Sequence, residues 1–152
     1  MGDKVSPANS NEEPMIEPQE DDAQKDDVFP SQGPEAIDSS ALETFEYEYP
    51  EREVELEIST DEFTAVCPFS GLPDFATIRI AYVPDKKCIE LRSLKYYLCT
   101  FRNVGIFHEH IVNRILEDLV RCCRPKRMRV TGDYKVRGGI HTVASVEYRN
   151  SE

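Results

Sequence analysis

The order in which two hydrophobic periodicities follow one another limits this chain to few folds. In four segments apolar side chains alternate with polar ones, a spacing of two that predicts β-strands. Between the second and third of them, residues 108–123 carry apolar side chains three or four positions apart, the stripe of an amphipathic helix that Pro125 ends. The alternating segments are 43–58, 75–82, 127–136 and 140–148.

A second, shorter helix is expected just before the long one. Ser93 suits the N-cap of a helix over residues 94–101, which residues 103–105 would end. The element order is then β-β-α-α-β-β, two hairpins around a pair of helices. This order predicts an α+β fold, an antiparallel sheet with both helices on one face. Such a sheet has open edges, so association into a larger closed assembly is expected.

The first 44 residues differ in composition from the rest of the chain. They hold twelve acids against two lysines, so a net charge of about −1 is left for residues 45–152 out of the total of −11. Few aromatic side chains and many Pro, Glu, Asp, Ser and Gln residues predict a disordered acidic tail over 1–44 and a folded domain over 45–152. The tail either solvates the domain or binds a partner.

The cysteine content and the hydropathy both bear on the compartment. Five cysteines, an odd number without paired spacing, favour a reducing environment. No stretch approaches the roughly 18 apolar residues of a membrane span, and the N-terminus lacks the apolar core of a signal peptide. A cytoplasmic protein without membrane contact is expected.

Cys67 and Asp74 stand at the two ends of one predicted turn. Cys67 follows a strand and precedes Pro68, and Asp74 comes after Gly71-Leu72-Pro73. A thiolate at the rim of a site, with an acid beside it, is suited to nucleophilic addition. The alternatives are a small buried cysteine and a turn aspartate bonded to its own backbone. A zinc site that uses Cys67 with a histidine is a weaker alternative, because the chain has no C-x-x-C pair.

Three further segments carry side chains suited to binding. Residues 90–97 combine Glu90, two spaced cations and two tyrosines, so they could contact both a heterocycle and phosphates. His108-Glu109 opens the long helix, where the acid either complements the helix dipole or accepts hydrogen bonds from a purine-like edge. Arg137-Gly138-Gly139 is either a plain hairpin turn or a loop that a phosphate approaches closely.

Taken together, these blocks resemble the NADPH-dependent 7-cyano-7-deazaguanine reductases of the short, single-domain type. The resemblance runs from about residue 63 to residue 148, with all blocks in order and similarly spaced. It implies the tunnelling fold, a β-β-α-α-β-β unit that assembles into a ring-shaped homo-oligomer with active sites between subunits. It also implies an NADPH-dependent oxidoreductase that reduces a nitrile on a small deazapurine, a step toward queuosine in transfer RNA, without direct nucleic-acid contact. The blocks are Cys67-Pro68, Gly71, residues 73–76, 90–97, 101–103 and 107–109, and Arg137-Gly138-Gly139.

The resemblance also assigns roles to matching positions. Cys67 would attack the nitrile carbon to form a thioimide, and Asp74 would supply protons. Glu109 would accept hydrogen bonds from the guanine-like edge and His108 would line the pocket, while Ile89, Glu90 and Leu91 would shape its other side. Arg92, Lys95 and Arg137 would bind the NADPH phosphates, and no metal is implied. Arg92 stands where the family usually has Lys, but it keeps the charge and can bind phosphate through two parallel hydrogen bonds.

Two other functions use the same features differently. A related tunnelling-fold enzyme would add ammonia to the thioimide or act as a zinc-dependent cyclohydrolase; the cations of residues 90–97 disfavour the first and the cysteine and histidine spacing disfavours the second. A non-enzymatic binding module would instead act through its acidic tail.

Overall fold

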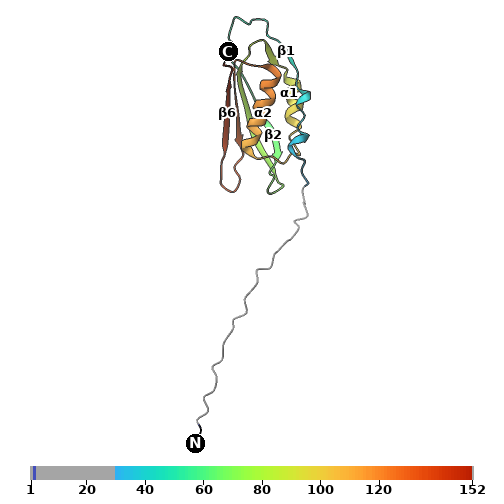
Figure 1. Cartoon of the computed structure of the whole chain (residues 1–152), viewed down its shortest axis with the longest axis vertical. Coiled ribbons are helices and arrows are strands. Elements are labelled where there is room, and N and C mark those ends of the chain that lie inside the picture. The colour runs from blue at the N-terminus through green and yellow to red at the C-terminus, as the bar shows by residue number, and fades with distance from the viewer. Residues whose placement is uncertain (1, 3–29, 152) are drawn as a thin grey trace.

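The fold is that of a computed structural model, which describes Gly2 and residues 30–151. Both α-helices lie on the same side of the main sheet (Figure 1). The expected α+β class, with an antiparallel sheet and two helices on one face, is therefore confirmed. The elements are η1 (Pro34–Ala36), η2 (Ser39–Ala41), β1 (Thr44–Glu46), β2 (Leu56–Val66), β3 (Pro73–Val83), β4 (Lys87–Ile89), α1 (Leu91–Cys99), α2 (His108–Cys123), β5 (Arg127–Tyr134) and β6 (Val143–Arg149).

The main sheet has four antiparallel strands in the order β2-β3-β5-β6. Because side chains alternate across a strand, the even-numbered residues of β3 and β5 face the helices and are buried. Ile78, Ile80 and Val130 on this face are at most 1 % exposed, and full burial of each contributes about 1.5–3 kcal/mol. Asp74, the first even position of β3, and Tyr134, the last of β5, lie on this face at the same end of the sheet, so the alternation that builds the core also directs these two side chains toward the helices.

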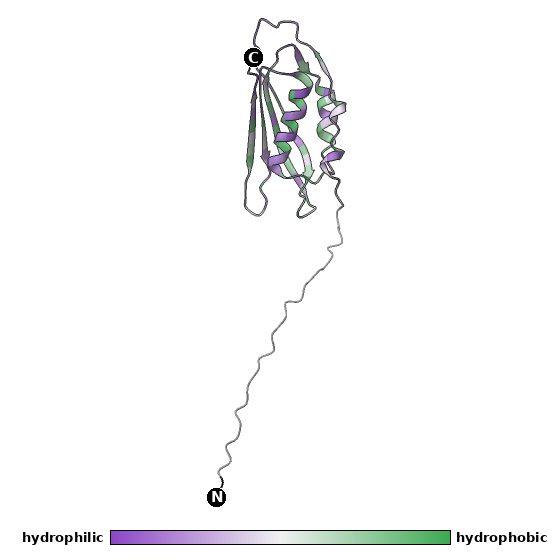
Figure 2. Ribbon diagram, in the orientation of Figure 1, coloured by the Kyte–Doolittle hydropathy of each residue, from purple (hydrophilic) through white to green (hydrophobic). Residues whose placement is uncertain are grey.

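Helix α2 covers the sheet with the stripe expected from the sequence. It spans His108–Cys123, as predicted, and its C-cap residue Arg124 has the left-handed conformation with φ 46°. Ile111, Ile115 and Leu119 on its inner face are fully buried. Figure 2 shows the green, apolar faces of both helices turned toward the sheet.

Helix α1 starts earlier than predicted. It begins at Leu91, three residues before the expected start, because Glu90 rather than Ser93 caps it. The Glu90 carboxylate accepts hydrogen bonds from the Arg92 and Ser93 amides at 2.9 and 2.7 Å. The Ser93 hydroxyl instead donates to the Glu90 carbonyl at 2.8 Å. Two acceptor oxygens satisfy two of the amides that a helix start leaves open, so the acid is the better cap here.

The predicted boundary at residue 44 is too late. Residues 31–44 form η1, η2 and the start of β1, which pairs with β4, and Ile37 is only 5 % exposed in the core. The Gln32 amide donates to the Asn103 carbonyl, and the Gly105 amide donates to the Gln32 carbonyl. The composition of this segment is polar, but its backbone groups and one isoleucine find partners on the domain. Met1 and residues 3–29 of the expected tail lie outside the described residues.

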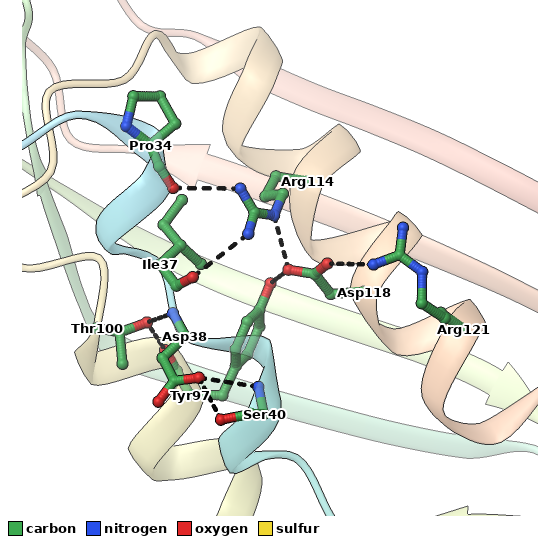
Figure 3. A network of polar contacts seen from close by, with 9 residues as sticks. All are labelled: Pro34, Ile37, Asp38, Ser40, Tyr97, Thr100, Arg114, Asp118 and Arg121. Carbon is green, nitrogen blue, oxygen red and sulfur yellow. Dashed lines mark hydrogen bonds and ion pairs between the residues drawn. The ribbon is translucent and has the colours of Figure 1, made fainter.

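A buried carboxylate fastens this segment to both helices (Figure 3). Asp118 of α2, 3 % exposed, accepts hydrogen bonds from the Tyr97 hydroxyl at 2.7 Å and from the Arg114 Nε at 2.8 Å. Arg114 also donates to the carbonyls of Pro34 and Ile37 at 3.2 and 3.4 Å. Burial and the bond to Asp118 raise the pKa of Tyr97, so its hydroxyl stays the donor. None of the described helices is long and apolar enough to cross a bilayer.

Candidate active site

Cys67 lies on the tight turn that joins β2 to β3. Its amide donates to the Leu72 carbonyl and its carbonyl accepts from the Gly71 amide, both at 2.9 Å. Gly71 has φ 70°, which a residue without a side chain adopts at little cost. The turn holds the thiol half-buried at the end of the sheet, the rim position expected from the sequence.

The surroundings of Cys67 favour its thiolate. Partial burial alone would raise the pKa of the thiol, but hydrogen bonds from the Ser70 hydroxyl and from the Ser70 and Phe69 amides outweigh burial and lower it. The nearby Asp74 charge acts in the opposite direction and does not reverse the result. A lowered thiol pKa is the condition for a nucleophilic cysteine at neutral pH. The other described cysteines with a shifted pKa, Cys88, Cys122 and Cys123, have it raised by burial.

Asp74 joins three elements at this end of the sheet. It is 5 % exposed, and its Oδ1 pairs with the Arg137 guanidinium from the β5–β6 loop. Its Oδ2 lies 3.2 Å from Nε2 of His108 at the start of α2. An isolated carboxylate would be costly to bury, and these two partners offset that cost. The structure therefore brings Asp74, His108 and Arg137 together beside Cys67.

Tyr134 completes this cluster and was missed from the sequence. Its ring stacks on the His108 imidazole with centroids 3.7 Å apart and planes at 7°. Its hydroxyl donates to the His108 carbonyl at 2.9 Å. The only sequence signal was that Tyr134 continues the even-numbered, inward-facing series of β5. Glu109, the next residue of α2, is exposed at the helix start.

The residues of the 89–92 segment lie apart from this cluster, and two of them have structural partners. Ile89 is 2 % exposed in the core, and its amide donates to the Tyr82 hydroxyl at 3.0 Å. Both carboxylate oxygens of Glu90 cap α1. Leu91 and Arg92 are exposed at the first turn of the helix. Glu90 is thus first of all a helix cap, which sequence reasoning did not anticipate.

A cavity of about 480 Å³ lies between β2 and α1. It has a largely apolar wall, with two cations and the acid Glu62 among its lining residues. An apolar wall with cations at its border is suited to a ring system that carries phosphates. Neither Cys67 nor Asp74 lines it, and Arg137 is held by Asp74 instead. Within one chain the cations Lys95 and Arg137, expected to act together, therefore lie in separate places. Lining side chains include Ile58, Phe63, Leu91, Leu94, Lys95 and Arg102.

Large apolar side chains surround the Cys67 end of the sheet without being buried. Phe69 is 87 % exposed and Ile140 is 71 % exposed. An exposed apolar group of this kind is typical of a surface that contacts another molecule. The strands β2 and β6 also present unpaired outer edges in the described sheet. Further members of the group are Leu72, Phe75, Phe107 and Val136.

The fold resembles that of a solved structure titled as the archaeosine synthase QueF-Like in its apo form. The TM-score is 0.57 at 21 % sequence identity, over 66 % of this chain and 96 % of that chain. Fold and site together define a QueF-like α+β domain with a cysteine and a buried aspartate at one end of its sheet.

Sequence comparison gives the family. The model described as QueF-like protein matches residues 73–152. A protein of Caldanaerobacter subterraneus is 50 % identical over 131 residues, covering 86 % of this chain and 98 % of its own length. One of Chlorobaculum tepidum is 53 % identical over 116 residues, covering 76 % and 99 %. Both are named NADPH-dependent 7-cyano-7-deazaguanine reductase. The chain belongs to this QueF-like family of reductases.

Proposed function

We propose that this protein reduces the nitrile of 7-cyano-7-deazaguanine to the aminomethyl group, with NADPH as reductant. The reaction is a step of queuosine biosynthesis and takes place in the cytoplasm. The observation that carries the proposal is the pairing of Cys67, whose pKa is lowered, with the buried Asp74 on one turn. A nucleophile and a proton donor side by side are what addition to a nitrile requires. The relatives' names, at about half identity over nearly their whole length, support the same substrate.

The chemistry at Cys67 balances in two reductions. The Cys67 thiolate attacks the nitrile carbon, a C–S bond forms, and one π pair moves to nitrogen, which takes a proton. The resulting thioimide accepts a hydride at carbon; the C–S bond then breaks and the thiolate leaves an imine. A second hydride and a second proton give the amine. Two hydrides and two protons are consumed, and Cys67 ends in its starting form.

Asp74 is the proton donor in this scheme. Its two carboxylate oxygens lie against the Arg137 guanidinium and the Nε2 of His108, so after donating a proton it can take another from the imidazole. His108, whose Nε2 faces Asp74, can pass on that proton and lies at the helix start that borders the turn. Proton transfer of this kind contributes about 10² to 10⁴ in rate.

Substrate selection is assigned to the start of α2 and to the 89–91 segment. The exposed carboxylate of Glu109 would accept from the ring N–H and the amino group of the guanine-like edge. A carboxylate left without these donors in a closed site is costly, which discriminates against analogues that lack them. Leu91 would contribute through its exposed side chain, while Ile89 is buried with its amide bonded to the Tyr82 hydroxyl. Glu90 contributes chiefly by fixing the first turn of α1.

When bound, NADPH supplies the two hydrides. Lys95 and Arg92 would hold its phosphates, since both lie on α1 and Lys95 borders the 480 Å³ cavity. The apolar wall of this cavity fits the rings of a dinucleotide. Arg137 can reach a phosphate only if it leaves Asp74. Of the three residues proposed to bind NADPH, it is therefore the one that the geometry supports least.

The separation of the cavity from Cys67 supports an active site completed between subunits of a homo-oligomeric ring. The exposed apolar group around Phe69 and Ile140 and the free edges of β2 and β6 would then be interfaces. Mixing tests this arrangement. Cys67→Ala and Lys95→Ala are each expected to be inactive, and rings reassembled from both should regain activity when one chain's cysteine faces the other's lysine. No recovery in demonstrably mixed rings would contradict shared sites.

Incubation with the nitrile and NADPH tests the activity directly. Loss of NADPH absorbance that depends on the nitrile is expected, together with a covalent adduct on Cys67 in the intact-mass spectrum. Cys67→Ala should abolish both, whereas Cys122→Ala, a half-buried cysteine at the far end of α2, should retain both. Full reductase activity in Cys67→Ala would overturn the proposed role of the thiol.

A further inference from the structure

We propose that Tyr134 is a positioning residue, which acts on the reaction by holding the His108 imidazole in the plane that directs Nε2 to Asp74. The inference rests on the proposed function, because it matters through the protons that Asp74 and His108 handle. Three independent contacts support it: the ring stack, the bond to the His108 backbone, and the space that Gly132 leaves.

The stack restricts the side-chain rotation of His108 that decides where its Nε2 points. An imidazole at the start of a helix rotates about two side-chain bonds, and only a narrow range brings Nε2 to a given oxygen. A second ring parallel to within 7° at 3.7 Å restricts rotation of the imidazole out of this plane. The contact that this restriction preserves is the one between Nε2 of His108 and Oδ2 of Asp74, 3.2 Å apart.

The hydroxyl of Tyr134 ties the same residue down a second time. It donates to the His108 carbonyl at 2.9 Å, so the backbone from which the imidazole extends is also held. Burial, with the nearby Glu109 and Asp74 charges, raises the pKa of Tyr134, and the phenol therefore remains a donor. Tyr134 is 2 % exposed and does not face solvent where a substrate would enter.

Gly132 makes room for the ring that does this work. It lies two residues before Tyr134 on the same face of β5. A methyl group at Gly132 would lie 2.9 Å from the Cε2 and Oη atoms of Tyr134, closer than carbon atoms approach. The tyrosine ring therefore occupies the space above Gly132, and a larger residue there would move the ring off His108. A substitution at position 132 therefore perturbs the stack without changing Tyr134 itself.

The variants separate the parts of this contact. Tyr134→Phe keeps the stack and removes the backbone bond, while Tyr134→Leu removes both. Gly132→Ala displaces the ring by one methyl group and keeps the tyrosine. Two matched controls change aromatic residues outside the cluster: Tyr97→Phe removes another buried phenol bond, and Tyr148→Leu removes another ring from the sheet.

The experiment measures how fast the Cys67 adduct forms from the nitrile alone across pH 5 to 10, so that cofactor binding does not enter. Tyr134→Leu should lower the rate at neutral pH by about 10²-fold, the loss typical of a misplaced reacting group, and should change the shape of the pH profile. Tyr134→Phe and both controls should keep the wild-type shape. The titratable and charged groups around the Asp74–His108 contact are Cys67, Glu109, Tyr134 and Arg137.

A double-mutant cycle decides between positioning and general stability. If Tyr134 acts through His108, His108→Ala combined with Tyr134→Leu loses no more than His108→Ala alone. Additive losses, or a wild-type pH profile in Tyr134→Leu, would overturn the inference. Should Tyr134→Leu not fold, the same cycle with Gly132→Ala gives the answer.

A structural readout keeps this inference separate from the proposed function. Ring-current shifts of the His108 ring protons in NMR spectra should be present in the wild type and in Tyr134→Phe, reduced in Gly132→Ala, and absent in Tyr134→Leu. Their absence in the wild type would refute the stack itself. No adduct in a wild type that shows these shifts would instead refute the proposed function.

Discussion

Removal of the Ser70 hydroxyl should raise the pKa of the Cys67 thiol. The hydroxyl and two turn amides are the groups that outweigh burial and keep this pKa low. Ser70→Ala deletes one of them and leaves the amides in place. Because the pKa is lowered in the native turn, the thiolate is present at lower pH than for an ordinary cysteine, and the variant should need a higher pH to form it.

The size of the effect follows from the exposure of the turn. A hydrogen bond to a charged acceptor contributes about 1.5–3 kcal/mol when shielded, and water replaces part of it at a half-buried thiol, so about 1 kcal/mol remains. One pKa unit is about 1.36 kcal/mol, so the midpoint should rise by about 0.7 unit and the thiolate fraction below it should fall about fivefold. The more basic thiolate is about twofold more nucleophilic. The net rate should fall two- to threefold below the midpoint and rise about twofold well above it, and the two pH profiles should cross.

Alkylation by iodoacetamide, followed by mass spectrometry of the Cys67 peptide from pH 5 to 10, measures this without substrate. The exposed Cys99 in the same sample is an internal reference whose alkylation should not change. Ser70→Thr keeps the hydroxyl, with its bonds to sulfur and from the Leu72 amide at 3.3 Å, and should stay near the wild type, so it separates loss of the hydroxyl from other effects of a substitution at this position. A midpoint that stays in place or moves to lower pH in Ser70→Ala would refute the assigned cause.

Three further substitutions test other parts of the molecule. Glu90→Ala should lower the free energy of unfolding in urea by about 0.5–2 kcal/mol, the usual loss for an N-cap, and an unchanged midpoint would mean that the cap adds nothing. Asp118→Ala should cost about 3–5 kcal/mol in the same measurement, because it leaves buried partners of a carboxylate uncompensated; a loss under about 1 kcal/mol would contradict the assigned role of this network. Glu109→Gln offers one acceptor oxygen to two donors, so kcat/KM for the nitrile should fall at least about 10²-fold, while Glu117→Gln, an exposed acid on the same helix, should match the wild type.

Periodicity predicted the parts of the fold that hydrophobic burial decides. The bounds of α2 were right because its apolar stripe is long and ends at an unambiguous breaker. The start of α1 was wrong by three residues because a serine and a glutamate competed for the cap, and only the geometry shows that the carboxylate reaches two amides. The alternating segment 43–58 was predicted as one unit, but its start forms β1 and its end begins β2, which continues to Val66 through an irregular register between Thr60 and Phe63.

The parts of the candidate site that lie close together in the sequence were predictable, and the contacts between residues far apart in the sequence were not. Cys67 and Asp74 share a turn, so their proximity followed from seven residues of sequence. The pairing of Asp74 with Arg137 required the ladder that sets β3 against β5, and the stack of Tyr134 on His108 required the position of the helix start above it. No local spacing carries that information, since the residues are separated by up to 63 positions.

Residues 31–44, which the composition assigns to the tail, form an outer layer of the folded domain. A protein that begins at residue 45 would lose two carbonyl acceptors of Arg114 and the buried Ile37 side chain, so it would be destabilised for reasons unrelated to catalysis. A truncation before Ser31 removes most of the acidic charge and keeps this layer. The Gln32 backbone also bonds to Gly105, which pairs with Val66, the neighbour of Cys67. The function of the acidic segment should therefore be tested with the truncation before Ser31, because the truncation at residue 45 also removes contacts that support the backbone next to Cys67.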